Sequence, residues 1–276
     1  MIFYKQKIYL CTSYSLTVMS PILFDSAVFG PVKSRRLGIS LGINLLPVNC
    51  KLCNYNCIYC ECGLTGKVPG TSVLPSRKEI REKLENKLGE MMFGESPLDT
   101  ITFAGNGEPT LHPEFGPIVS DVLFLRQAYF PSVKVAVLTN GTMIHKKEIA
   151  EALQKVDMNI IKIDSAIEET YLTLNRPSAA DSLEELVARI KKFPGKFIIQ
   201  TMFVQGTFNG IEVDNTTEYE VEKWVELLQS LRPQMVMIYT IDRKPAEKGI
   251  TKVPESKLHE IATMAKKAGI KTMIAG

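Results

Sequence analysis

The chain has 276 residues, and its 33 basic and 30 acidic side chains leave a formal net charge of +3. Hydrophobic residues make up 45% of the sequence and charged residues 23%, which excludes disordered, collagen-like and long coiled-coil proteins. The small net charge disfavours a protein that coats nucleic acid. No apolar run approaches the roughly 18 residues of a membrane span, so we predict a cytoplasmic protein without a membrane segment.

The N-terminus differs in pattern from the rest of the chain. Residues 1–18 lack the apolar core and the small-residue cleavage site of a secretory signal. Regular patterning begins near Phe24, and Met19 is a second candidate start residue. We expect residues 1–23 to form an N-terminal extension, which is a loose tail, an edge strand or the product of an over-called start. Residues 24–276 are expected to form one domain, because no linker rich in Pro, Gly or Ser interrupts them.

Short apolar runs alternate with longer charged runs of helical period along most of the chain. The apolar runs predict six strands, at residues 39–45, 100–104, 133–139, 159–164, 197–204 and 235–241. Helices are predicted between them, beginning near Ser76, Pro113, Lys146, Asp181 and Glu218, and again at 256–268. Ser76 and Asp181 each precede a glutamate by three residues, which is the spacing of a capping box. A short apolar run at 271–274 is a candidate seventh strand.

The predicted strands are almost continuously apolar, which favours parallel strands covered by helices. Six such units are too few for a closed eight-fold barrel, so we predict an α/β fold, a partial (β/α)6 TIM-like barrel with parallel strands. In this architecture the loops that follow the strand C-termini line the active site. Polar residues concentrate in these loops, in 105–109, 139–141, 164–165 and 239–243. We expect them to meet around one mouth.

Five of the six cysteines fall within 13 residues, at Cys50, Cys53, Cys57, Cys60 and Cys62. Neighbours this close cannot tie distant segments together by disulfides, so the cluster indicates a metal site. Cysteine thiolates are the usual protein ligands of iron–sulfur clusters. The spacing Cys53-x3-Cys57-x2-Cys60 supplies three thiolates, which leaves one iron of a 4Fe-4S cluster open to bind a small molecule.

Two other metal sites are compatible with the same cysteines. Cys50 with Cys53, and Cys57 with Cys60, form two Cys-x2-Cys pairs of the kind that binds zinc. Only three residues separate these pairs, whereas zinc ribbons leave about 15–20 residues between them. An electron-transfer cluster with Cys50 as a fourth ligand is the second alternative. Cys62 is either a hydrogen donor or extra ligand, or a packed thiol.

The segment Cys53-Asn54-Tyr55-Asn56-Cys57-Ile58-Tyr59-Cys60 resembles the cysteine signature of the radical S-adenosylmethionine (SAM) enzymes. Two further segments resemble motifs of the same family in the same order. They are Gly105–Glu108 after the second predicted strand and Leu138–Thr142 at the third. The resemblance covers residues 24–276, and a partial six-unit barrel is also the fold that it implies.

The resemblance implies that Cys53, Cys57 and Cys60 hold a 4Fe-4S cluster whose open iron binds SAM. It also implies that one electron from a reduced flavodoxin or ferredoxin cleaves SAM, and that the resulting 5′-deoxyadenosyl radical abstracts hydrogen from a substrate. The cofactor then supplies the chemistry, and the protein orients the reactants. The other class of function left open is an iron–sulfur electron carrier or metal-stabilised binding protein without SAM chemistry.

The resemblance also implies a set of SAM-binding residues at the strand ends, namely Tyr59, Gly105, Asn106, Gly107, Glu108, Asn140, Asp164 and Gln200. In this set Tyr59 lies beside the adenine or simply packs the loop. The two glycines let the backbone approach the methionine amino group. Glu108 either accepts a hydrogen bond from that ammonium or caps the next helix. Asn140 lies near the methionine carboxylate, and Asp164 either meets a ribose hydroxyl or pairs with Lys162.

Within the radical SAM enzymes, the closest resemblance is to small iron–sulfur oxidoreductases related to tRNA wyosine-base synthesis enzymes. It is carried by Phe29–Val32, Ser34–Gly38, Gly107–Thr110 and Tyr239–Arg243. Wyosine enzymes carry a second set of cluster cysteines upstream of the signature, and here the upstream cysteines are too few for one. No RNA-recognition module is present, so the substrate stays open between RNA, a small molecule and a protein.

Four residues near strand-end loops are candidates for substrate contacts, namely Arg176, Tyr239, Asp242 and Arg243. We expect Asp242 or Arg243 to face the cavity, and the alternative is that Arg243 pairs with Glu247 in the following loop. Arg35 and Arg36 either meet a phosphate or carboxylate, of the substrate or of SAM, or bond to backbone at the barrel floor.

Overall fold

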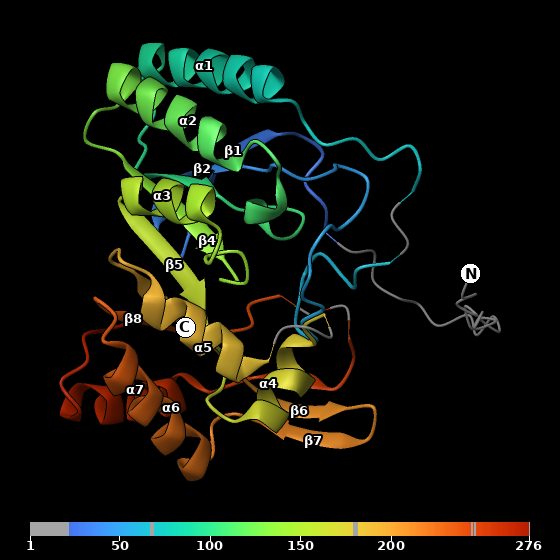
Figure 1. Ribbon diagram of the computed structural model, residues 1–276, viewed down its shortest axis with the longest axis vertical. Coiled ribbons are helices and arrows are strands. Elements are labelled where there is room, and N and C mark those ends of the chain that lie inside the picture. Colours follow the sequence, from blue (N-terminus) through green and yellow to red (C-terminus); the bar gives the residue numbers. More distant parts are fainter. Residues whose placement is uncertain (1–21, 67–68, 179–181, 244, 246, 276) are drawn as a thin grey trace.

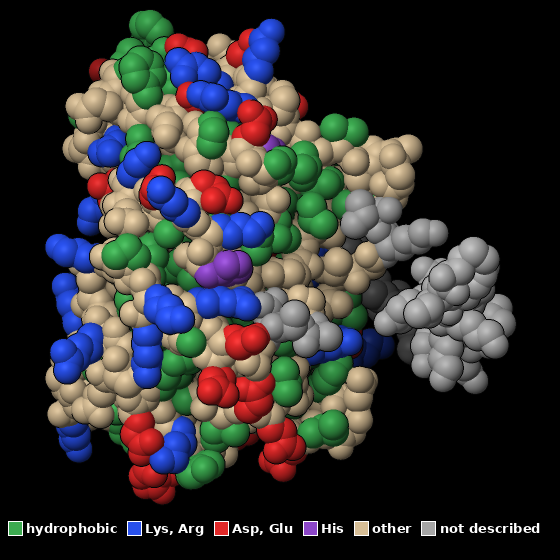
Figure 2. Space-filling view, viewed as in Figure 1, with side chains coloured by type: hydrophobic (Ala, Val, Ile, Leu, Met, Phe, Trp, Pro, Cys, Tyr) green, Lys and Arg blue, Asp and Glu red, His purple; other side chains and the backbone are tan. Residues whose placement is uncertain are grey.

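The structure is a computed structural model that describes residues 22–66, 69–178, 182–243, 245 and 247–275. The expected N-terminal extension lies outside the described residues except for its last two positions. Within the described part, no helix is long and apolar enough to cross a membrane. Figure 2 shows basic and acidic side chains interspersed over most of the face in view, as the small net charge leads one to expect.

Ten strands of the described chain form one curled sheet in the order β1-β2-β3-β4-β5-β6-β8-β10, with β7 and β9 paired to β6 (Figure 1). The strands from β2 to β10 in this order are parallel, and β1 is antiparallel to β2. The bounds of the ten strands are β1 Val28–Ser34, β2 Gly38–Ile43, β3 Thr100–Phe103, β4 Lys134–Thr139, β5 Met158–Lys162, β6 Ile198–Phe208, β7 Ile211–Asp214, β8 Val236–Thr240, β9 Ile250–Lys252 and β10 Thr272–Ala275.

Helices fill the connections between the parallel strands and bury an apolar face against the sheet (Figure 1). Their bounds are α1 Arg77–Phe93, α2 Phe115–Tyr129, α3 Lys147–Lys155, α4 Glu168–Asn175, α5 Leu183–Lys192, α6 Glu218–Leu231 and α7 Glu255–Lys267, with a short 3₁₀ helix η1 at Pro109–Leu111. The structure confirms the predicted fold class, because parallel strands and outer helices form a partial TIM-like barrel. All six predicted strands are present, and the run at 271–274 forms the seventh parallel strand, β10.

Helix starts follow the capping signals, with one shift. The Ser76 hydroxyl accepts a hydrogen bond from the Glu79 backbone at 3.2 Å, as predicted for α1. The N-cap of α5 is Ser182, and the predicted cap Asp181 lies outside the described residues. The elements that sequence patterning missed are β1, β7, β9 and α4, of which β9 has only three residues and α4 only eight.

Along each strand every second side chain points into the barrel. Inward-pointing residues two positions apart therefore form two successive layers of side chains. The lower layer is a small apolar cluster formed by Leu37, Ala136, Ile160, Ile198 and Met237. Leu37 belongs to the turn between β1 and β2, so this turn plugs the interior. Two residues further along β5, β6 and β8, the corresponding side chains line a cavity and are polar, namely Lys162, Gln200 and Tyr239.

Candidate active site

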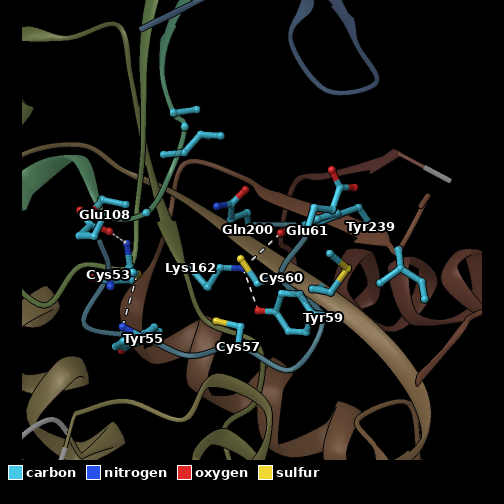
Figure 3. Close-up of a pocket in the computed structure, with 18 of the residues that line it drawn as sticks. Cys53, Tyr55, Cys57, Tyr59, Cys60, Glu61, Glu108, Lys162, Gln200 and Tyr239 are labelled. Atoms are coloured by element: carbon cyan, nitrogen blue, oxygen red, sulfur yellow. Dashed lines mark hydrogen bonds between the residues drawn. The ribbon is translucent and has the colours of Figure 1, made fainter. Parts of the chain in front are cut away.

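A cavity of about 310 Å³ opens at the mouth of the barrel (Figure 3). The cysteine loop, residues 50–63 in the connection between β2 and α1, contributes all three predicted metal ligands to the lining, Cys53, Cys57 and Cys60. Most of the predicted SAM-binding and substrate residues also line it, namely Tyr59, Gly105, Gly107, Glu108, Asn140, Gln200, Tyr239, Asp242 and Arg243. The expected convergence of strand-end loops around the cysteine loop is therefore present.

The cysteine loop is held on one side by the loop after β3. Leu52 and Gly107 form a parallel bridge, and the Glu108 amide donates to the Leu52 carbonyl at 3.1 Å. Gly107 has a φ of +140°, and a Cβ there would lie 1.8 Å from the Leu52 oxygen. The glycine is thus required by the contact between the two loops, and not only by the approach of a ligand as predicted from sequence.

The other side of the cysteine loop is held by the end of α4. The amides of Asn56 and Ile58 donate to the carbonyls of Asn175 and Leu174, each at 3.0 Å. The helix ends at Arg176, which adopts a left-handed conformation and places its guanidinium carbon 5.2 Å from the centre of the Phe208 ring. Arg176 does not line the cavity, so the structure does not bring this substrate candidate together with the others.

The thiols of the cysteine loop differ in their electrostatic surroundings. Burial raises the pKa of the thiols of Cys53 and Cys57 above their ordinary values. A hydrogen bond with Cys62, together with the charge of Lys51, lowers the pKa of the Cys60 thiol to about 5. Thiolates at Cys53, which is half-buried, and at Cys57, which is buried, therefore need a positively charged partner to persist.

The donor set fits an iron–sulfur cluster better than a single ion. In the described residues no three His, Cys, Asp or Glu side chains converge tightly enough to hold one metal ion. A single zinc ion holds each sulfur at about 2.3 Å, so its ligands must meet at one point. The three thiols instead lie around a cavity, as a cluster of several irons requires. Cys50 does not line the cavity, which disfavours the four-cysteine alternative.

Lys162 stands at the centre of a buried polar network (Figure 3). Its amino group donates to the hydroxyls of Tyr59 at 2.9 Å and Tyr239 at 3.3 Å, and pairs with Asp164 at 3.5 Å. Although burial lowers the pKa of Lys162, the carboxylate of Asp164 raises it above its ordinary value. From the sequence, Lys162 was predicted only as a partner of Asp164, yet its side chain lines the cavity.

Asp164 is fully buried and accepts hydrogen bonds from the Tyr59 hydroxyl, the Asn175 amide at 2.5 Å and the Met202 backbone at 2.8 Å. It is absent from the cavity lining. The pair with Lys162, one of the two alternatives for Asp164, is present. The contact with a ribose hydroxyl stays a prediction.

Glu108 ties two loops together beneath the cavity. Its carboxylate accepts from the Thr139 hydroxyl and the Asn140 backbone, both at 2.7 Å, and from the Thr110 amide at 3.1 Å. The last bond caps η1, so the capping alternative is present. The side chain of Asn140 donates to Asn54 in the cysteine loop at 2.7 Å, which links the end of β4 to the cluster ligands.

Asn106 is the second predicted SAM contact that the structure places elsewhere. Its side chain is fully buried, accepts from the Phe24 amide at 2.9 Å, and donates to the carbonyls of Phe24 and Pro47, also at 2.9 Å. The residue is absent from the cavity lining. It holds the N-terminal segment against the loops of the mouth.

Arg243 faces the cysteine loop, as expected. Its guanidinium donates to Glu61 at 3.1 Å, and Glu61 stands between Cys60 and Cys62. The alternative pair with Glu247 is not formed. Glu61 was not among the predicted site residues, although its position between Cys60 and Cys62 was a usable signal.

Comparison with known proteins decides the family. The radical SAM superfamily profile matches residues 50–166, the segment that holds the three cysteines, the glycine loop and the end of β5. The chain is also 31% identical to a UPF0026 protein of Synechocystis, over 77% of this chain and 74% of that protein. The chain belongs to the radical SAM superfamily.

The chain is also similar to a second UPF0026 protein and to a solved radical SAM structure. It is 33% identical to a UPF0026 protein of Methanocaldococcus jannaschii over 80% of its own length, and it spans 65% of that relative. The crystal structure of a radical SAM methyltransferase from Sphaerobacter thermophilus superposes with a TM-score of 0.63 at 14% identity, covering 85% of this chain and 65% of that one. At 14% identity, the match to the methyltransferase structure shows a shared fold only.

Membership of this superfamily confirms the prediction that the chain is an enzyme. The superfamily also implies SAM and an iron–sulfur cluster. Radical SAM enzymes also require a reductant. The alternative of an electron carrier or binding protein without SAM chemistry is therefore set aside.

Proposed function

We propose that this enzyme holds a 4Fe-4S cluster through Cys53, Cys57 and Cys60 and abstracts hydrogen from an organic substrate. The bound cluster, reduced by a flavodoxin or ferredoxin, would cleave SAM to methionine and a 5′-deoxyadenosyl radical. The observation that carries the proposal is that three thiols line one cavity, with Cys57 buried and Cys53 and Cys60 half-buried. Residues 24–276 act as the single domain that supports this site.

The chain's own residues position the reactants. Tyr59 lies in the cavity wall with its hydroxyl held by Lys162, so its ring offers a rigid surface for an adenine. Gly105 and Gly107 line the cavity after β3, where their backbone would lie beside the methionine end of SAM. A Cβ at either position would collide with Asn44 or Leu52, so both glycines keep this loop in place. Asn140 is oriented by its bond to Asn54 and supplies a polar group beside that end.

The test is the metal content and SAM chemistry of anaerobically purified protein. We expect about four irons per chain in the wild type, and loss of the cluster in Cys53→Ala, Cys57→Ala and Cys60→Ala. Cys50→Ala is the matched control, because Cys50 belongs to the same loop and does not line the cavity. With dithionite and SAM, the wild type is expected to release 5′-deoxyadenosine slowly without substrate.

Two outcomes would contradict the proposal. Cluster loss in Cys50→Ala with retention in Cys53→Ala would show a different ligand set. A protein that holds four irons and binds SAM, yet releases no 5′-deoxyadenosine under reduction, would not carry out the proposed chemistry.

A further inference from the structure

The basic side chains that line the cavity differ in whether a carboxylate neutralises them. Arg243 pairs with Glu61 at 3.1 Å, Arg35 with Asp242 at 3.8 Å and Lys162 with Asp164 at 3.5 Å. Among the described residues, the two cations of the cavity lining without a carboxylate partner are Lys51 and Arg36. Lys51 donates to the Gly63 carbonyl at 2.9 Å inside the cysteine loop, so it serves that loop.

Arg36 is held in place by neutral groups. Its guanidinium carbon lies 4.2 Å from the centre of the Tyr239 ring, and Nη1 donates to the Gln200 side-chain oxygen at 2.9 Å. The stacked ring and the single hydrogen bond fix the plane of the guanidinium without neutralising its charge. Gln200 therefore orients Arg36, and its contact with SAM stays a prediction.

The backbone of Arg36 is equally well anchored. The Ser34 hydroxyl accepts from the amides of Arg36 and Leu37, at 3.3 and 3.2 Å. Leu37 is buried in the apolar layer that plugs the barrel, directly after Arg36 in the chain. The turn between β1 and β2 therefore holds the half-buried Arg36 inside the barrel, fixed by Ser34 and Leu37.

The hydrogen bond to Gln200 and the Tyr239 ring replace only part of the hydration that the half-buried guanidinium of Arg36 loses, because neither partner carries a negative charge. Arginine binds carboxylates and phosphates through two parallel hydrogen bonds, and such charge-assisted bonds are strong. We propose that Arg36 is the anchor for an oxyanion of the substrate, so that the substrate is a carboxylate or a phosphate compound. This inference rests on the proposed function, because it assigns the cavity to a SAM-dependent reaction.

SAM also carries a carboxylate, and the position of Arg36 argues against that source. The partners of Arg36 are on β6 and β8, whereas Gly105, Gly107 and Asn140, which we assign to the methionine end, follow β3 and β4. These two groups of strands are separated by β5 in the sheet. The oxyanion at Arg36 therefore belongs to the second reactant.

The test measures oxyanion binding to the cluster-loaded protein with saturating SAM, by anaerobic calorimetry. The probes are inorganic phosphate and pyrophosphate for one source and succinate for the other. We expect saturable binding of one class of probe, weakened at least about tenfold in Arg36→Gln, since a bidentate charged contact is removed. Lys33→Gln is the matched control, because Lys33 lies on the same β1–β2 hairpin as Arg36, is exposed and does not line the cavity.

Iron content, melting temperature and SAM affinity are measured for every variant, and we expect Arg36→Gln to keep all three. Wild-type protein that binds none of the probes, or Arg36→Gln that binds them as well as wild type, would overturn the proposal. Loss of SAM affinity in Arg36→Gln would assign the residue to the SAM carboxylate and overturn it as well. Oxyanion binding by a protein that fails to cleave SAM would instead count against the proposed function alone.

Discussion

The side-chain amide nitrogen of Asn175 lies 3.5 Å from the sulfur of Cys57, and both residues are buried. The same amide donates to the Tyr59 hydroxyl at 3.0 Å and to Asp164 at 2.5 Å. Asn175 therefore connects a proposed cluster ligand to the polar network of the cavity wall. Hydrogen bonds to ligand sulfurs are one of the factors that set the reduction potential of an iron–sulfur cluster.

Replacing Asn175 with leucine is expected to lower the reduction potential of the cluster, because a donor to the sulfur stabilises the more negative reduced state. The expected shift is about 20–60 mV, the equivalent of a net hydrogen bond of roughly 0.5–1.5 kcal/mol. Potentiometric titration followed by electron paramagnetic resonance measures it. Thr173→Val is the control, since the Thr173 hydroxyl bonds to Glu169 within α4. Equal potentials in both variants and wild type would remove Asn175 from the control of the cluster.

A second prediction concerns the contact between Gly107 and Leu52. In Gly107→Ala the new methyl group would meet the Leu52 oxygen at 1.8 Å, and the φ of +140° would itself be strained. Leu52 immediately precedes Cys53, so we expect reduced iron content together with destabilisation of about 1–3 kcal/mol. Iron analysis and thermal unfolding of the variant check both effects.

Gly66→Ala is the control for Gly107→Ala, because a Cβ at Gly66 meets nothing within 4 Å. If Gly107→Ala keeps its iron and stability and loses only SAM affinity, the glycine serves ligand approach, as the sequence motif suggests. That result would contradict the structural role assigned to the contact with Leu52.

The contrast between Gly107 and Asn175 shows how far the sequence could lead. Gly107 stood in a recognisable motif after an apolar strand, so its position at the mouth could be predicted from the order of strands. Its partner Leu52 could not, because the contact joins two loops whose relative placement depends on the whole barrel. Asn175 had no signal at all, since it ends α4, an eight-residue helix without a marked apolar face that patterning missed.

The surroundings of Arg36 could also be predicted only in part from the sequence. Its turn could be recognised as part of a family-like segment, and a role at the barrel floor was one of its alternatives. Contact with Tyr239 and Gln200 required knowing that the β1–β2 turn folds into the barrel interior. The antiparallel strand β1 that creates this turn contains Gly30 and Pro31, residues that are unfavourable within strands and so concealed it from sequence patterning.

A third prediction concerns pH. His112 is buried, its Nδ1 accepts from the Glu114 amide at 3.1 Å, and its Nε2 lies 3.0 Å from the Pro75 carbonyl. This arrangement holds the neutral ring, and burial lowers the pKa of His112 below its ordinary value. As the pH falls below about 6.5, the unfolded chain gains a proton at this residue that the folded chain does not.

The free energy of unfolding should therefore decrease as the pH falls from 7 towards 5. The contribution of His112 has a limiting slope of about 1.4 kcal/mol per pH unit. Urea unfolding of wild type and His112→Gln at several pH values within this range measures it. We expect a smaller pH dependence in His112→Gln, although that variant is less stable at pH 7. Parallel slopes for the two proteins would show that His112 does not cause the acid sensitivity.

The last prediction concerns the ion pair between Arg243 and Glu61, which joins the loop after β8 to the cysteine loop across the mouth. The two side chains are 61% and 40% exposed, so the pair contributes only about 0–1 kcal/mol to stability and weakens with salt. The pair lies beside Cys60 and Cys62, so we expect it to limit the access of solvent to the proposed cluster.

Arg243→Ala is expected to keep its iron content, its melting temperature and slow 5′-deoxyadenosine release, since Arg243 is not assigned to SAM. Removal of the side chain opens the mouth beside the cluster, so we expect the cluster to bleach several-fold faster in air than in wild type. High salt should accelerate bleaching of the wild type towards the rate of the variant, because it screens the exposed pair. Lys223→Ala is the control, as it removes another exposed pair, with Glu226, on α6 far along the chain from the cysteine loop. Equal bleaching rates in Arg243→Ala, Lys223→Ala and wild type would mean that the pair is a surface contact without influence on access to the cluster.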